Sequence, residues 1–167
     1  MQQVDVLGVR VSADGTRLVV CLQEMRSGMV LPIVVGARER AAIASAQAGV
    51  VPPRPLTHDL ALDLVRAAGQ HLVQVRVTHQ ADGVYFAEIH LGGGVVIDAR
   101  PSDAIALALR AGCPILCDET LLVHEGEHGG RAAERDVPEG EAHRQVEEFT
   151  AFLQHVQADD FRDPGRA

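Results

Sequence analysis

The sequence predicts an α+β domain with mixed and antiparallel sheets, built from a duplicated β-β-β-α unit with helices packed on the sheet, plus a C-terminal helix. Two observations predict this class. Short runs of alternating apolar and polar residues, separated by Asp-Gly and Gly-rich turns, are typical of antiparallel strands. An Ala-rich helical stretch follows three such strands twice, in residues 4–49 and in residues 71–112.

The first unit contains three predicted strands, at residues 4–11, 17–22 and 29–35. Ala13-Asp14-Gly15 is predicted to join the first two as a hairpin turn, because Asp-Gly tolerates the positive φ that tight turns need. Pro32 places the third strand at a sheet edge or a bulge, because proline cannot donate to a strand ladder. A helix is predicted over residues 37–48, closed by Gly49.

Residues 51–55 contain three prolines and predict an extended connector. A second helix is expected over residues 57–68, with Thr57 as its N-terminal cap. Asp59 lies in the first turn, where a negative charge suits the helix dipole. Its apolar stripe consists of Leu60, Leu64, Val65 and Ala68, and such a stripe is expected to face the core.

The second unit contains predicted strands at residues 71–79, 84–91 and 95–98, a helix that ends near Gly112, and a short strand at 114–117. Ala37-Arg38 matches Ala99-Arg100 at an offset of 62 residues. At this offset Gly36 and Ala41 stand opposite Asp98 and Asp103. The two acids are therefore expected to be particular to the second unit, as specialisation after duplication would produce.

The chain is predicted to divide into an α+β domain at 1–123, a flexible polar linker at 124–144, a C-terminal helix at 145–161 and a tail at 162–167. The helix is predicted from the helical spacing of Val146, Phe149, Phe152, Leu153 and Val156. The formal net charge of −8 falls entirely on the part from Cys113 onward. The folded part therefore has no basic field to attract phosphate backbones, which counts against a non-specific nucleic-acid binder. A nuclease whose metal ion supplies positive charge stays possible.

Three cysteines, Cys21, Cys113 and Cys117, have no zinc-type spacing and are expected to be reduced thiols in a cytoplasmic protein. The first ten residues lack the pattern of a signal peptide, and no apolar run is long enough to span a membrane. We expect no membrane association.

Asp98, Arg100 and Asp103 lie at a predicted strand-to-helix junction and allow two interpretations. In one, the carboxylates bind a divalent metal while Arg100 steadies a phosphate oxygen. In the other, Arg100 bridges the two acids and Asp103 stabilises the helix N-terminus.

His58 and Glu88 are weaker candidates. His58, beside Asp59 at a helix start, is either a general base or metal ligand, or an exposed first-turn histidine beside a capping residue. Glu88 is expected on the outward face of a strand, a position that by itself indicates no function.

Two segments resemble the signature of the bifunctional nuclease domain family: Arg54-Pro55-Leu56-Thr57-His58-Asp59-Leu60 and Ile97-Asp98-Ala99-Arg100-Pro101-Ser102-Asp103-Ala104-Ile105-Ala106-Leu107-Ala108. The likeness covers about residues 4–123. It implies a compact α+β domain, often dimeric, and for some members hydrolysis of both DNA and RNA. Motif position alone carries over His58, Asp59, Asp98, Arg100 and Asp103 as candidates.

The expected function is therefore metal-assisted hydrolysis of DNA or RNA, with nucleic acid as a transient substrate of a homodimer. Asp98 and Asp103, with Asp59 or Glu88, would hold Mg²⁺ or Mn²⁺, without an organic cofactor. His58 would activate water and Arg100 would stabilise charge on phosphorus. The alternative is a non-catalytic dimeric binding or regulatory module in which the same Asp and Arg residues form a structural network. Proximity of His58 to Asp98 would favour a single active site.

Overall fold

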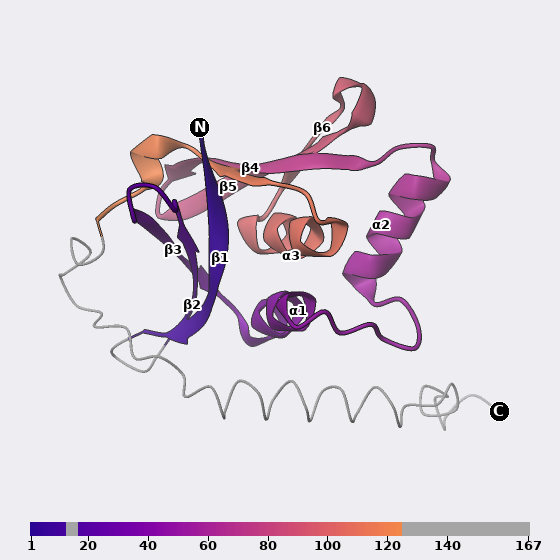
Figure 1. Cartoon of the computed structure of the whole chain (residues 1–167), viewed down its shortest axis with the longest axis horizontal. Coiled ribbons are helices and arrows are strands. Elements are labelled where there is room, and N and C mark those ends of the chain that lie inside the picture. Colours follow the sequence, from indigo (N-terminus) through magenta and orange to yellow (C-terminus); the bar gives the residue numbers. More distant parts are fainter. Residues whose placement is uncertain (13–16, 125–167) are drawn as a thin grey trace.

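One curled sheet organises the protein in the computed structural model, which describes residues 1–12 and 17–124 (Figure 1). Its strand order is β3-β2-β1-β7-β4-β5-β6, and among these described strands only the β4–β7 pair is parallel. The strands are β1 (Gln2–Val11), β2 (Leu18–Gln23), β3 (Val30–Val35), β4 (Leu72–Ala81), β5 (Val84–Leu91), β6 (Val96–Ala99) and β7 (Ile115–Cys117). The predicted α+β class is confirmed.

Each half of the sheet is an antiparallel set of three consecutive strands followed by a helix. Strands β1–β3 lead into α1 (Ala37–Gln47), and strands β4–β6 lead into α3 (Pro101–Ala111). Figure 1 shows both helices on the concave side of the curled sheet. Strand β7 lies between β1 and β4 and joins the halves. Strand β3 is an edge strand, as Pro32 predicted.

The structure changes how the two units align. Helix α1 begins at Ala37 after Gly36, and α3 begins at Pro101 after Arg100. Counted from the first residues of the helices, the offset between the units is 64 residues, whereas the buried Ile43 and Ile105 keep the offset of 62. The third residue of α1 is Glu39 and the third residue of α3 is Asp103, so an acid at this position is not particular to the second unit.

The core lies between the sheet and the helices. Its fully buried side chains include Leu22, Leu31, Ile43, Ile105, Val75 and Val77. In the second half, the buried residues Val75 and Val77 pair with Ile89 and Ala87 and face the helices. Because side chains alternate along a strand, the intervening residues lie on the opposite, open face of the sheet.

Helix α2 (Thr57–Ala67) packs on α3 with a different face from the one predicted. Leu62 is buried and Val65 is partly buried, whereas Leu60 and Leu64 are 51% and 62% exposed. Thr57 is the first helical residue and not the cap, which is Leu56. The backbone N–H of Leu56 donates to Asp59 Oδ2 at 3.0 Å, so the Asp59 carboxylate satisfies the helix start instead.

Four predictions lie outside the described residues: the turn at 13–15, most of the linker at 124–144, the helix at 145–161 and the tail at 162–167. Within the described part of the chain, no helix has both the length and the apolar character that crossing a bilayer requires.

Candidate active site

Four charged or ionisable side chains from three helices meet at the N-terminus of α3. His58 Nε2 of α2 lies 3.3 Å from Asp103 Oδ1. Arg100 donates from Nε to Asp103 Oδ2 at 2.7 Å and from Nη2 to Asp103 Oδ1 at 3.1 Å. Arg100 also donates from Nη1 to Glu39 Oε1 of α1 at 3.3 Å. The structure therefore brings together three predicted site residues and adds Glu39.

Local sequence explains why these groups converge. Strand β6 delivers Arg100 to the position before α3, and Pro101 starts the helix with a backbone angle that suits its first turn. Asp103 is the third residue of α3, where its negative charge is favourable near the helix N-terminus. Glu39 holds the same position in α1, so the two carboxylates face Arg100 from equivalent helix starts.

The electrostatics of Asp103 are set by opposing effects. Partial burial raises the pKa of its carboxyl group, but the hydrogen bonds from Arg100 and His58 outweigh burial, so that the net pKa lies below the usual value. Asp103 in turn raises the pKa of the Arg100 guanidinium. The carboxylate is thus ionised at neutral pH and able to hold the imidazole of His58 in one orientation.

The cluster is open to solvent on its Arg100 side. The Arg100 side chain is 66% exposed, whereas Asp103 and His58 are 33% and 18% exposed. Of the five guanidinium N–H donors, three donate to carboxylates, which leaves one N–H on each terminal nitrogen for an incoming oxygen. If Nε2 of His58 donates to Asp103, Nδ1 keeps its lone pair, which is the state required of a general base.

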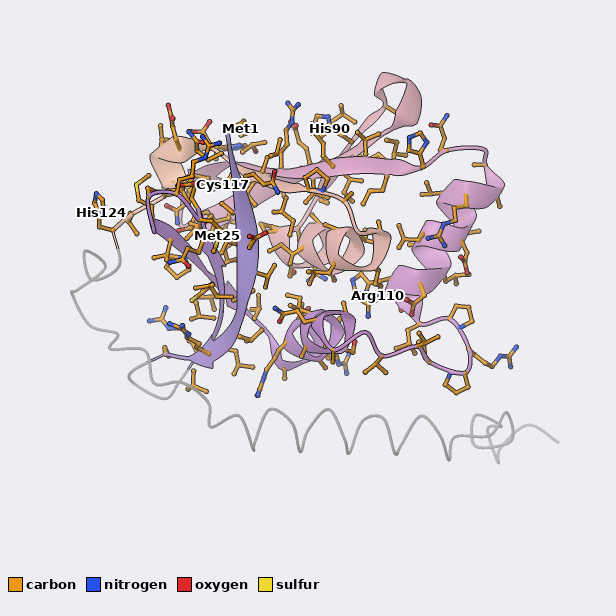
Figure 2. All side chains as sticks on the ribbon, viewed as in Figure 1. Met1, Met25, His90, Arg110, Cys117 and His124 are labelled. Atoms are coloured by element: carbon orange, nitrogen blue, oxygen red, sulfur yellow. The ribbon has the colours of Figure 1, made fainter. Side chains whose placement is uncertain are left out.

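Asp98 and Glu88 lie elsewhere. They pair across β5 and β6, in a register that also pairs buried Ala87 with Ala99. Both side chains therefore belong to the open face of the sheet, away from the helices that carry His58 and Asp103. Glu88 Oε2 lies 2.9 Å from Nε2 of His90, which Figure 2 shows on the side of the sheet away from α3. His58 therefore contacts Asp103, whereas Asp98 lies on the other face of the sheet.

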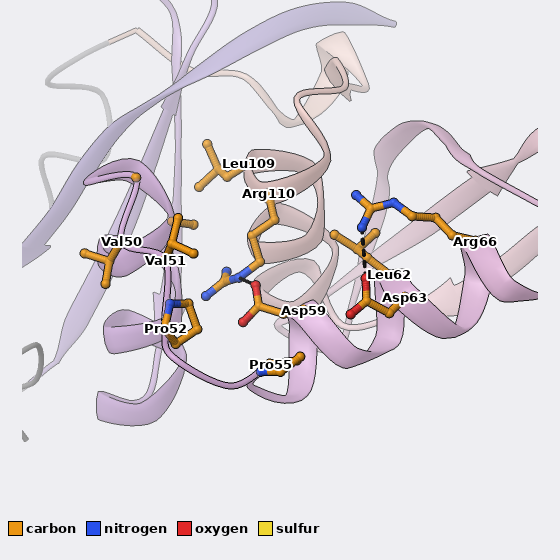
Figure 3. A pocket seen from close by; sticks show the side chains of 12 residues that line it. Val50, Val51, Pro52, Pro55, Asp59, Leu62, Asp63, Arg66, Leu109 and Arg110 are labelled. Atoms are coloured by element: carbon orange, nitrogen blue, oxygen red, sulfur yellow. Dashed lines mark hydrogen bonds and ion pairs between the residues drawn. The ribbon is translucent and has the colours of Figure 1, made fainter. Parts of the chain in front are cut away.

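Asp59 belongs to a third arrangement. Its Oδ1 accepts from Arg110 Nε at 3.0 Å, and Arg110 is only 10% exposed (Figure 3). Arg110 also donates to the carbonyl of Ala42 and to Ser45 Oγ, both in α1. This side chain from α3 therefore ties α1 and α2 together. A pocket of about 380 Å³ lies beside it, with apolar residues mainly from the connector between α1 and α2 and charged side chains from α2 and α3.

The predicted metal ligands do not fit one cation site in this arrangement. The four acids occupy three separate places: one holds Asp98 and Glu88, another Asp103 and the third Asp59. Both carboxylate oxygens of Asp103 and of Asp59 already accept hydrogen bonds. Among the residues that the structure describes, no group of three His, Cys, Asp or Glu side chains is placed to hold a metal ion.

Sequence reasoning missed Glu39 and Arg110. Glu39 could have been found by aligning the two units at their helix starts, because it then stands opposite Asp103. Arg110 had no local signal, since a basic residue in the last turn of a helix is favourable in any exposed helix.

Comparison with known proteins places this sequence in a family. The sequence matches the bifunctional nuclease domain over residues 20–128. An uncharacterized protein of Mycobacterium tuberculosis is 39% identical over 162 residues, which are 97% of this chain and 99% of that protein. Bifunctional nuclease 1 of Arabidopsis thaliana is 29% identical over 163 residues, covering 85% of this chain and 50% of the plant protein. Bifunctional nuclease 2 of the same plant is 32% identical over 114 residues, 65% of this chain and 35% of that protein. The two motifs and these matches agree: the chain belongs to the bifunctional nuclease domain family.

Proposed function

We propose that the protein hydrolyses phosphodiester bonds of DNA or RNA at the cluster of His58, Asp103 and Arg100. The observation that carries this proposal is the His58–Asp103 contact beside an exposed guanidinium that keeps N–H donors available. A histidine oriented by a carboxylate, next to a donor for a phosphate oxygen, has the parts that phosphoryl transfer to water requires. The names of the plant relatives support the same reaction class.

In the proposed reaction His58 accepts a proton from water while the water oxygen bonds to phosphorus. Asp103 holds the imidazole and stabilises the imidazolium that forms. Arg100 donates its remaining N–H groups to a non-bridging phosphate oxygen, where negative charge grows in the transition state. The bond from phosphorus to the leaving oxygen breaks, and the leaving oxygen takes a proton from the imidazolium.

The charge of Arg100 alone does not settle whether the reaction needs a divalent cation. Glu39 and Asp103 offset the charge of Arg100, so the cluster alone attracts a phosphate only weakly. We keep a requirement for Mg²⁺ or Mn²⁺ as part of the proposal. Its ligands would not be one cluster formed by the four acids predicted from the sequence.

The test is cleavage of end-labelled single-stranded DNA and RNA by the purified full chain, with and without EDTA. We expect His58→Asn to lower turnover by about 10²- to 10⁴-fold, the usual contribution of a general base. Asp98→Asn is the matched control, because it removes a carboxylate from the other face of the sheet, and it should retain activity. Full activity in His58→Asn would exclude this site.

The rival function is a non-catalytic dimeric module, and one observation favours a dimer in either case. Strand β6 ends the sheet, and its Val96 and Ile97 are 50% and 44% exposed. The opposite edge, β3, is protected by Pro32 and by a bridge from Val30 to Val123. We propose that β6 pairs with β6 of a second copy. Absence of any nuclease activity in a confirmed dimer would favour the rival.

We propose a reducing, cytoplasmic compartment. Cys113 and Cys117 are free thiols, and burial raises the pKa of Cys117 to about 12, so this thiol is inert. Fractionation of cells that express the tagged chain tests the compartment.

A further inference from the structure

We infer that Glu39 is a positioning residue of this site, which acts by holding Arg100 in place against Asp103. Its effect on turnover rests on the proposed function, whereas its effect on Arg100 does not. Glu39 comes from the first unit and lies outside both family-like segments, so neither motif points to it.

The geometry places Arg100 between two carboxylates. Asp103 binds the side of the guanidinium formed by Nε and Nη2, and Glu39 binds Nη1. Asp103 is only three residues away on the same helix start, so it travels with Arg100. Glu39 lies on another helix and is 24% exposed, so it ties the end of an exposed side chain to a second part of the fold.

Gly36, the residue before α1, supplies an independent observation. Its φ of −82° and ψ of 171° are open to any residue, so the backbone does not require glycine there. A Cβ on Gly36 would nevertheless collide with the end of the Glu39 side chain in its present conformation, so that this flexible carboxylate would have to move. Gly36 therefore leaves room for the conformation in which Glu39 reaches Arg100.

Helix packing does not need this contact. Arg110 already links α3 to α1 through the Ala42 carbonyl and Ser45 from a buried position. The pair of Arg100 with Glu39 is largely exposed on the arginine side, and exposed ion pairs contribute little to stability. Orientation of the guanidinium is therefore the effect that the contact can supply.

Orientation matters because the guanidinium fork is planar and rigid. Fixing Nη1 sets the directions of the uncommitted N–H groups on the two terminal nitrogens, so that a phosphate oxygen meets a donor already in place. A guanidinium held by Asp103 alone keeps more freedom and must be ordered further whenever a transition state forms, which lowers turnover more than binding.

The first experiment measures Arg100 directly in the full chain, by NMR hydrogen exchange of its guanidinium N–H groups. Glu39→Ala removes both the acceptor and its charge. Gly36→Ala keeps the charge but displaces the carboxylate. Both should speed exchange by about five- to tenfold, the factor expected for one charge-assisted hydrogen bond at a partly exposed site. Glu39→Gln keeps an acceptor and should restore most of the protection.

The three variants separate position from charge. Unchanged exchange in Gly36→Ala together with faster exchange in Glu39→Ala would show that charge alone matters and would overturn the inference. Unchanged exchange in both, or no protection by Gln, would also overturn it. This readout needs no activity, so it decides the inference even if the wild-type chain cleaves no nucleic acid.

The second experiment divides kcat from KM in the cleavage assay. Glu39→Ala and Gly36→Ala should lower kcat by about five- to tenfold, with KM changed less than about twofold, and Glu39→Gln should recover most of kcat. A change confined to KM, or equal kcat in Gly36→Ala and wild type, would contradict positioning. Inactivity of the wild type would instead overturn the proposed function alone.

Discussion

Arg110 Nε lies 3.0 Å from Asp59 Oδ1, and this contact gives Asp59 a different role from that of its neighbour His58. His58 and Asp59 are adjacent at the start of α2, yet the first contacts Asp103 and the second contacts Arg110. Both partners belong to α3. The motif therefore connects α2 to α3 twice, once at the candidate site and once in the helix packing.

Removing Arg110 should destabilise the fold. Arg110→Ala leaves Asp59 and the acceptors in α1 without their donor, and we expect a loss of about 2–4 kcal/mol in the free energy of unfolding. Arg66→Ala is the matched control, because its ion pair with Asp63 is exposed on both sides and should contribute less than about 1 kcal/mol. Urea denaturation of both variants measures the difference. Equal losses would show that Arg110 is not a structural link.

The two acids of the second motif should respond differently to neutralisation. Asp103→Asn weakens charge-assisted hydrogen bonds and should cost about 1–2 kcal/mol of unfolding free energy. Asp98→Asn should change stability by less than about 0.5 kcal/mol or increase it, because Asp98 stands directly opposite Glu88 and loses a like-charge repulsion. Thermal melting of both proteins measures this. A larger loss of stability in Asp98→Asn than in Asp103→Asn would contradict these separate roles of the two acids.

Stability should depend on pH through Asp103. Because its folded-state pKa is lowered, Asp103 contributes stability above its ordinary pKa of 3.8, and this contribution is lost as pH falls through the folded pKa. The difference in unfolding free energy between wild type and Asp103→Asn should therefore shrink as pH falls from about 5 to about 2. Denaturant titrations across this range measure the difference. A difference that stays constant would argue against a lowered pKa.

The β6 edge gives a prediction about assembly. Ile97→Lys places a charge on the proposed pairing strand and should convert a dimer to a monomer, measured by light scattering after gel filtration. Val34→Lys is the control, since Val34 is 55% exposed on β3, the edge at the other end of the sheet. A monomeric wild type, or loss of the dimer in Val34→Lys alone, would exclude the β6 interface.

Local patterns were sufficient to predict the order of the elements. Alternation or short apolar runs bounded by turns located every described strand to within a few residues, and glycines marked the helix ends, as at Gly112 with its φ of 66°. The sequence did not predict correctly which face of α2 is buried. Leu60 and Leu64 repeat at helical spacing but lie on an exposed face, because periodicity shows that an apolar stripe exists and not what covers it.

The candidate site was only half predictable. His58, Arg100 and Asp103 lie in the family-like segments, but their spacing did not show that Asp98 would face the other way. Asp98 lies in a strand and Asp103 in a helix. The two residues are therefore close in sequence, but their side chains lie on different sides of the sheet. Glu39 is 61 residues from Arg100, and no local pattern reports a contact of that range.

Strand β7 has a consequence for the order in which the chain folds. Each half of the sheet is made of neighbouring strands and can form by local contacts, whereas β7 pairs with β1 and with β4, far away in the chain. Residues 115–117 must therefore be synthesised before the halves can be joined into a continuous sheet. Since contacts between distant segments form slowly, this seam is expected to be the late, rate-limiting step of folding.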